Sequence, residues 1–354
     1  MAQSWWVENP VEVNLSTLRF NLLKIWLLSL SVVILTIQII AWGLPEDPYD
    51  AKKKDFELQA DNIEALVMGV SHARAVHFQS MGIPGFSYHD PGSDLQTVFE
   101  KYRAISPLTP NLKYVLLPLS PSYLYVVRSD MQRTARESVY FRNYPKYTNF
   151  QGSLYWTLLL QEPQYLLQKL RKSLKKQFKK LISNSHTASK SPSCTPENSR
   201  DKPQQNGFIG GYFDIYAEGK CLKNLAMVSI KMHLDLTLEK NGPEGNFEKN
   251  KFIMNKLITQ IAANGHQLVL FIPPFTAEYY EHSTRDKIKT EQVGYLKELS
   301  LQSNVQFLDY HDLFYQRNYI ERNTLFYDDN HLGLSGAMEF SKLFGEAIRD
   351  FDKY

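Results

Sequence analysis

Two short segments, about 260 positions apart, contain the residue types that acyl-transfer chemistry requires. In the first, GVSHAR at 69–74, Ser71 follows a short apolar run. In the second, FYDDNHL at 326–332, Asp328 precedes His331 by three positions. A carboxylate at that spacing in a turn can reach the imidazole, orient it and stabilise its protonated form. An imidazole held in this way is a competent general base for a serine hydroxyl.

Each segment also has a simpler structural interpretation. A serine that opens a helix is a common N-cap, and an aspartate followed by a histidine can be a capping acid beside a surface histidine. Ser71, however, lies between an apolar run and a helical pattern, which places its hydroxyl at the carboxyl edge of a sheet. Backbone N–H groups at the start of that helix can point at a developing negative charge. Together, the two segments predict a Ser71–His331–Asp328 arrangement.

The elements that would position these residues alternate between strands and helices. Short apolar runs, typical of strands buried on both faces of a parallel sheet, occupy 63–70, 84–88 (the weakest), 113–119, 267–272 and 305–308. Helical patterns occupy 72–81, 94–105, 247–264 and 333–351. Ser93 is the expected N-cap of the second helix. This alternation predicts an open α/β sheet with right-handed crossovers.

One long stretch, 121–250, interrupts the alternation and is predicted to be a helical insertion. Its 155–184 part is an amphipathic helix that is strongly basic over 165–182, and either packs on the domain or binds an anionic membrane or polymer. The polar tract 183–207 is expected to be a disordered loop. Cys194 and Cys221 either form a disulfide outside the cytoplasm or stay unpaired.

Residues 25–43 carry no charge over 19 positions, about the length of helix that crosses a bilayer core. A cleaved signal peptide or a buried core helix are the alternatives. The positive charges before the run place the N-terminus in the cytoplasm and the body outside it, as in a single-pass protein of the inner membrane with a periplasmic domain. The predicted division is a cytoplasmic 1–24, the transmembrane helix 25–43, a linker 44–61 and an extracytoplasmic domain 62–354.

The composition of the chain excludes several other classes of protein. A net charge of only +3 argues against a general nucleic-acid binder. A mean hydropathy of −0.35 excludes a multi-pass transporter. Two cysteines cannot make a disulfide scaffold or a four-cysteine zinc site.

A metal site is the weaker alternative for the same residues. His72, His77 and His89 could join Asp328 or Asp329 around a metal, but no compact ligand motif such as H-E-x-x-H occurs. His72, next to the serine, could instead line the pocket. Asp329 and Asn330 are interpreted as turn-forming residues. We therefore predict neither a metal nor a cofactor.

A serine after the first strand, combined with D-x-x-H before the final helix, resembles the SGNH (GDSL-like) hydrolase family. The resemblance implies a flavodoxin-like three-layer sandwich of about five parallel strands, with an N-terminal transmembrane helix before it. The α/β-hydrolase elbow, G-x-S-x-G, fits less well, because Ala73 stands at its second glycine. The match looks closest to membrane-anchored, DltD-like proteins that modify envelope polymers, which also have one N-terminal span, a G-x-S element and F-Y-D-x-x-H-L.

The resemblance assigns roles residue by residue. Ser71 would be the nucleophile, His331 the general base and Asp328 the residue that orients it. The N–H groups of Ser71 and Gly92 would form the oxyanion hole. The family asparagine after the third strand is missing, and Ser120 or Ser122 could supply a weaker donor in its place.

Two functions follow from this resemblance. The first is a membrane-anchored serine esterase or O-acyltransferase that acts, through an acyl-enzyme, on acyl groups of envelope polysaccharide or polymer. The missing asparagine motivates the second, a catalytically degenerate SGNH fold that assists a multi-pass acyltransferase or a polysaccharide export system. Expected partners are therefore the acylated polymer or sugar, the membrane through 25–43, and no nucleic acid.

Overall fold

The computed structural model describes residues 15–43, 48–89, 93–127, 242–282, 286–318 and 325–351. Its centre is a sheet of five parallel strands in the order β2-β1-β3-β4-β5. The strands are β1 (Ala65–Val67), β2 (Gly85–Ser87), β3 (Tyr114–Pro118), β4 (Gln267–Ile272) and β5 (Val305–Asp309). This strand order is the flavodoxin-like one. The predicted parallel α/β sheet is confirmed.

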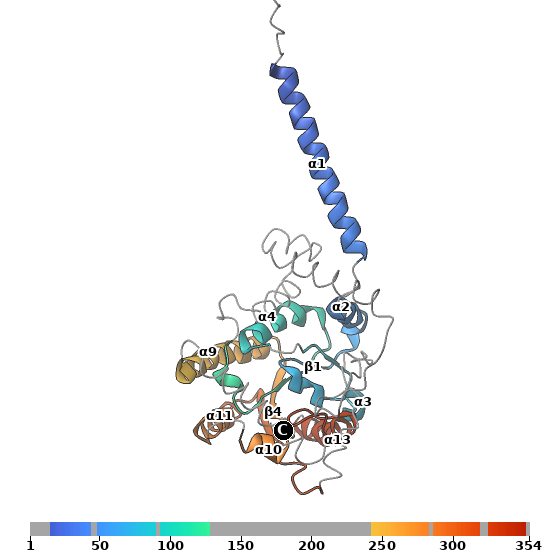
Figure 1. The fold of residues 1–354 in the computed structure, drawn as a ribbon. Coiled ribbons are helices and arrows are strands. Elements are labelled where there is room, and N and C mark those ends of the chain that lie inside the picture. Colours follow the sequence, from blue (N-terminus) through green and yellow to red (C-terminus); the bar gives the residue numbers. More distant parts are fainter. Residues whose placement is uncertain are drawn as a thin grey trace, which may run out of the picture.

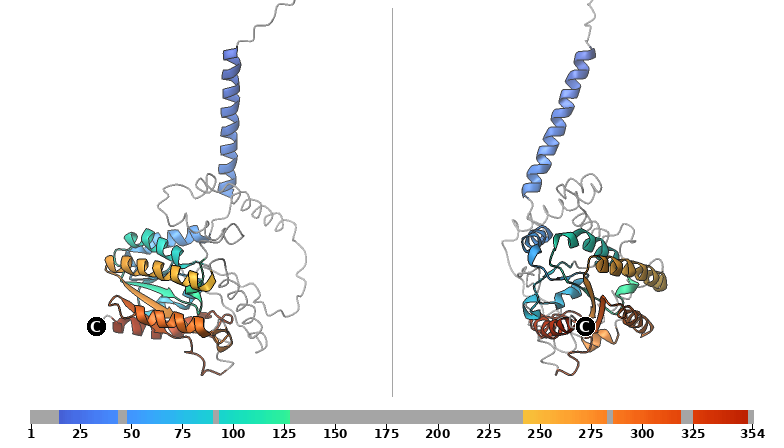
Figure 2. Two further views of the ribbon diagram at one scale, coloured as in Figure 1. Left: turned by 90° about the vertical axis from the view of Figure 1, so that its left-hand side faces the viewer. Right: turned by 180° about the vertical axis from the view of Figure 1, so that it is seen from behind.

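Helices cover both faces of the sheet, which explains why its strands read as continuous apolar runs (Figures 1 and 2). Successive strand residues point to opposite faces, so Leu66 belongs to one buried cluster and Val67 to the other. The first cluster includes side chains of α4 (Leu95–Ile105), α9 (Gly242–Ala263) and α11 (Asp286–Leu299). The second includes side chains of α3 (Phe78–Met81) and α13 (Leu334–Phe351).

Several helices differ in detail from the sequence prediction. The expected helix at 72–81 is two pieces, the 3₁₀ helix η2 (Ser71–Ala75) and α3. The N-cap of α4 is Asp94 and not Ser93, because the Asp94 carboxylate accepts hydrogen bonds from the Thr97 N–H at 3.0 Å and the Thr97 hydroxyl at 2.7 Å. The helix α11 was not predicted. The remaining short elements are α2 (Pro48–Gln59), η1 (Ala60–Asn62), η3 (Ser106–Leu108), η4 (Tyr123–Tyr125) and α10 (Ala277–Tyr280).

The predicted insertion 121–250 is too long at both ends, because η4 and the first turns of α9 belong to the packed body. The Asn250 amide donates to the Leu124 carbonyl at 2.8 Å, and the Asn246 amide donates to the Tyr125 carbonyl at 3.1 Å. These bonds fasten the start of α9 to the chain that follows β3. The predicted helix 155–184, its basic part 165–182, the polar loop 183–207 and both cysteines, Cys194 and Cys221, lie outside the described residues.

A 29-residue helix, α1 (Leu15–Gly43), contains the predicted transmembrane segment 25–43 and extends away from the sheet (Figure 1). Within the described part of the chain, no helix combines the length and the hydropathy needed to span a bilayer. The predicted transmembrane helix is therefore not supported by the structure.

Candidate active site

Ser71 lies just beyond the carboxyl end of β1, where a glycine turns the chain into η2. Gly69 has φ of 101°, in the region that favours glycine, and a Cβ there would lie 3.1 Å from the Leu117 side chain of β3. The chain can therefore turn sharply after the strand and begin η2 at Ser71. This local geometry explains the Gly-Val-Ser order in the sequence.

The loop before α13 carries the other two residues and is closed by backbone bonds. Phe326 and Leu332 form an antiparallel bridge, and the Tyr327 N–H donates to the His331 carbonyl at 2.8 Å. Within this loop the Asp328 carboxylate accepts the backbone N–H groups of Asn330 at 2.9 Å and His331 at 2.8 Å. Aspartates commonly bond to backbone N–H groups in tight turns, and here this bonding places the carboxylate beside the imidazole.

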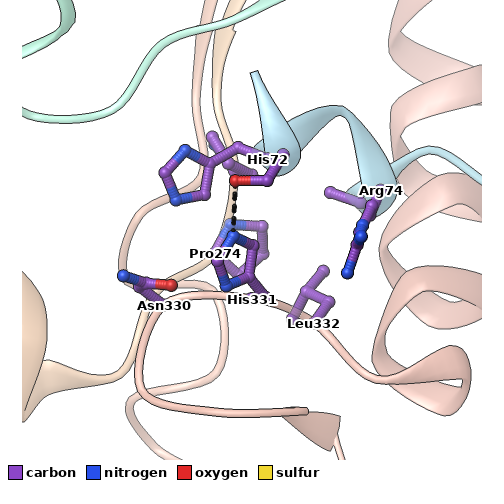
Figure 3. Close-up of a pocket in the computed structure, with 9 residues that line it drawn as sticks. His72, Arg74, Pro274, Asn330, His331 and Leu332 are labelled. Carbon is purple, nitrogen blue, oxygen red and sulfur yellow. Dashed lines mark hydrogen bonds between the residues drawn. The ribbon is translucent and has the colours of Figure 1, made fainter. Parts of the chain in front are cut away.

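The structure brings Ser71, His331 and Asp328 into one hydrogen-bonded line. The Ser71 Oγ atom lies 2.7 Å from His331 Nε2, the contact drawn dashed in Figure 3. On the other side of the ring, Nδ1 lies 2.9 Å and 3.0 Å from the two Asp328 carboxylate oxygens. All three distances lie within the ordinary range for hydrogen bonds.

Electrostatics favours an ionised Asp328. Burial raises the pKa of this carboxyl group, but the charge of His331 and the hydrogen bonds from His331 and Asn330 together lower it by more. The pKa of Asp328 therefore lies below its ordinary value. A carboxylate only accepts hydrogen bonds, so His331 Nδ1 carries the proton that lies between them. In the neutral ring, Nε2 is then the acceptor for the Ser71 hydroxyl.

A second histidine packs on the first. The His72 ring stacks on His331 with centroids 4.9 Å apart and planes 20° apart, and contacts Phe275 edge-on at 5.2 Å. The other two histidines proposed as metal ligands bond to serines, His77 to Ser80 at 2.9 Å and His89 to Ser87 at 2.7 Å. In the described residues, no group of three or more His, Cys, Asp or Glu side chains is arranged to hold a metal ion.

A small, open pocket lies beside the serine and the imidazole (Figure 3). Its other walls include Arg74 from η2, Pro273 and Pro274 from the end of β4, and Asn330 from the last loop. Asn330, which the sequence suggested as a turn former, is thus also a pocket residue. The place of Arg74 in the pocket was predictable, because Arg74 lies three residues after Ser71 and residues three apart in a 3₁₀ helix lie one above the other. The place of Pro273 and Pro274 was not predictable, because only the order of the strands brings them to the pocket.

The predicted oxyanion donors are not all at the pocket. Ser120 and Ser122 do not line it, and the Ser120 carbonyl accepts the Gln292 amide at 2.7 Å instead. Gly92 lies outside the described residues. The structure therefore gives no replacement for the missing asparagine at the positions that the sequence suggested.

Comparison with known proteins bears on the fold and not on the site geometry. A family model described as an SGNH domain (fused to AT3 domains) matches residues 184–346. This match supports the SGNH superfamily. The matched range includes Asp328 and His331 but begins at residue 184, well after Ser71. The assignment of Ser71 therefore rests on the sequence pattern and the hydrogen bond alone. No curated protein matches the chain.

Proposed function

We propose that the chain is an SGNH-type serine esterase or O-acyltransferase that acts on acyl groups of a cell-envelope polysaccharide or polymer. The observation that carries this proposal is the 2.7 Å contact between Ser71 Oγ and His331 Nε2, with the Asp328 carboxylate on the far side of the ring. The association of the matched family with AT3 acyltransferase domains supports acyl-modifying chemistry.

The reaction uses the line of hydrogen bonds twice. Ser71 Oγ attacks the ester carbonyl carbon while its proton passes to His331 Nε2, and Asp328 stabilises the imidazolium that forms. The tetrahedral intermediate collapses, the C–O bond to the leaving alcohol breaks, and His331 returns the proton to that alcohol. Water or a sugar hydroxyl then attacks the acyl-serine, gives its proton to His331 and releases Ser71, which recovers the proton. Water as acceptor makes the protein an esterase, and a sugar hydroxyl makes it a transferase.

Replacing the nucleophile tests the proposal. Ser71→Ala is expected to abolish labelling by a fluorophosphonate probe and to lower turnover of 4-nitrophenyl acetate by about 10³-fold or more. Ser300→Ala is the matched control, because its hydroxyl donates to a carbonyl on the surface at the end of α11. Full labelling and turnover by Ser71→Ala would overturn the assignment.

One observation favours a second function, a degenerate fold that assists a multi-pass acyltransferase or a polysaccharide export system. Neither Ser120 nor Ser122 lines the pocket in place of the missing asparagine, so one oxyanion donor has no replacement there. Loss of one such donor typically costs about 10²–10³ in turnover. Under this alternative, a strain carrying Ser71→Ala modifies its polymer as the wild type does.

Membrane attachment through 25–43, with the domain outside the cytoplasm, is the last part of the proposal. The uncharged run of 19 residues supports it. We expect the protein to sediment with membranes, to resist carbonate extraction and to become soluble when 1–43 is deleted. Release of the full chain by carbonate would contradict this part alone.

A further inference from the structure

The pocket beside Ser71 has a marked charge asymmetry. Arg74 lines it, and none of the nine described residues that line it is acidic. Ser71 and Arg74 are three apart in a 3₁₀ helix, so their side chains leave the same side of η2. In the view of Figure 3, Arg74 lies on one side of the Ser71–His331 hydrogen bond and His72 on the other. A fixed positive charge therefore lies at the place where an ester must bind.

Other positive groups lie near His89, which follows β2. Lys52 of α2 donates to the His89 carbonyl at 2.7 Å, and Lys101 of α4 lies 3.5 Å from the Tyr88 carbonyl. Both lysines are buried. Burial, followed by the positive charges of Lys52, Arg74, Lys101 and His331, holds the pKa of His89 well below its ordinary value. These positive groups lie near enough to His89 to act on its charge.

Asn330 adds a second polar group to the same pocket. Its side chain is only 4% exposed, and its Oδ1 atom accepts no hydrogen bond in the structure. Figure 3 shows that oxygen directed toward His331 and not away from the pocket. A buried acceptor without a partner carries a desolvation cost that a ligand hydroxyl can remove.

We propose that the substrate of this pocket is an acyl ester of an acidic sugar, with its anionic group bound by Arg74 and a sugar hydroxyl donating to Asn330 Oδ1. This inference rests on the proposed function and names its substrate class. A guanidinium binds carboxylate or phosphate through two parallel N–H···O bonds, so the Arg74 side chain can bind either group. The proposal requires no chemical step beyond those already given.

Three sugars that share one ring test the proposal. Glucuronate, glucose 6-phosphate and glucose differ only at C6, and each is used to protect Ser71 from a small neutral fluorophosphonate. In the wild-type full chain we expect one or both anionic sugars to protect at concentrations at least about tenfold lower than glucose does. The better of the two identifies the anion as carboxylate or phosphate.

Variants then assign the effect to residues. Arg74→Gln is expected to remove the advantage of the anionic sugars, and Arg74→Lys to keep part of it, since lysine retains the charge but not the fork. Asn330→Ala is expected to weaken all three sugars alike by about threefold to tenfold. Arg103→Gln is the control, because Arg103 pairs with Glu100 on the exposed face of α4. If Arg74→Gln does not fold, as judged by thermal melting, Arg74→Lys decides.

The two proposals fail in different ways. Equal protection by the three sugars, or an anionic advantage that survives in Arg74→Gln, overturns the acidic-sugar inference and leaves the serine assignment standing. If the wild-type chain is not labelled at all, the serine assignment fails. Titration calorimetry of the same sugars with the Ser71→Ala chain then decides the binding inference, which is overturned if the anionic sugars bind no better than glucose.

Discussion

Two Asp–His pairs lie at the carboxyl edge of the sheet, and only one of them faces a serine. In the last loop, Asp328 bonds the backbone N–H and the ring of His331 at 2.8 Å and 2.9 Å. At the end of β5, the Asp309 carboxylate accepts the backbone N–H of His311 at 3.2 Å and lies 2.8 Å from its ring Nδ1. In both pairs an aspartate carboxylate therefore holds a nearby imidazole by Nδ1.

The two pairs differ in what the rest of the imidazole meets. His331 Nε2 contacts Ser71 Oγ at 2.7 Å and lines the pocket. The His311 ring stacks on Tyr280 with centroids 4.0 Å apart and planes 17° apart, and it does not line that pocket. An Asp–His bond fixes a tautomer, but nucleophilic catalysis also needs the serine and space for the ester. The second pair is thus an internal control for the first.

Removing each imidazole is expected to show the largest difference between the two pairs. His331→Ala deprives Ser71 of its base, so we expect esterase activity to fall by about 10⁴-fold or more. His311→Ala is expected to change activity by less than about twofold, because its ring serves only local packing. Both variants are assayed with 4-nitrophenyl acetate after their folding is checked by circular dichroism. A comparable loss in both would show that the two pairs act together.

Replacing each carboxylate by an amide gives a smaller and sharper difference. Asp328→Asn keeps the shape of the loop but favours the wrong ring tautomer, so we expect activity to fall by about 10³–10⁴-fold. Asp309→Asn is expected to leave activity within about twofold. Labelling rates with a fluorophosphonate provide the measurement. Equal rates in Asp328→Asn and wild type would mean that Asp328 does not orient His331.

The sheet and the convergence of the two segments were predictable because they follow from local patterns. The run 267–272 is apolar at every position after Gln267, and it forms β4 over the same residues. A parallel sheet brings the ends of all its strands to one edge, so a serine after β1 and a loop before the last helix were both expected at that edge. Their spacing of about 260 residues is bridged by topology and not by any local signal.

Other features depend on tertiary packing that a single sequence does not express. Ser93 and Asp94 are both acceptable N-caps, and only the bonds from Thr97 decide for Asp94. The ends of the insertion were missed because the apolar residues of 121–127 gave no strand or helix period. The sequence pattern predicts only a turn at Asn330, because its role in the pocket depends on where the loop rests against η2.

Replacing one glycine in the turn before Ser71 and one in the helix α11 compares the effect of a Cβ at the two places. Gly69→Ala places a Cβ at φ of 101° and 3.1 Å from Leu117, so we expect unfolding free energy to fall by about 1–3 kcal/mol. Activity per folded molecule should fall as well, because Ser71 moves with the turn. Gly294→Ala in α11 meets nothing within 4 Å and removes a helical glycine, so it should stabilise the fold by about 0.5–1 kcal/mol. Urea unfolding measures both, and an unchanged midpoint for Gly69→Ala would refute the strain argument.

The pH dependence of the unfolding free energy gives the smallest and most specific difference between the Asp328 and Asp309 carboxylates. The pKa of Asp328 is lowered in the folded protein, so its ionised form stabilises the fold above its unfolded pKa of about 3.9, and this contribution is lost as pH falls through the lower folded value. We expect wild type to exceed Asp328→Asn in unfolding free energy by about 1 kcal/mol at pH 5 and pH 7, with the difference shrinking below pH 4. Asp309 and His311 are a little over a quarter exposed, at 27% and 28%, and Asp309→Asn should cost less than about 0.5 kcal/mol at neutral pH. Urea unfolding at pH 3, 5 and 7 gives both comparisons. A difference at Asp328 that persists undiminished at pH 3 would mean that shape, and not charge, holds the carboxylate in the site.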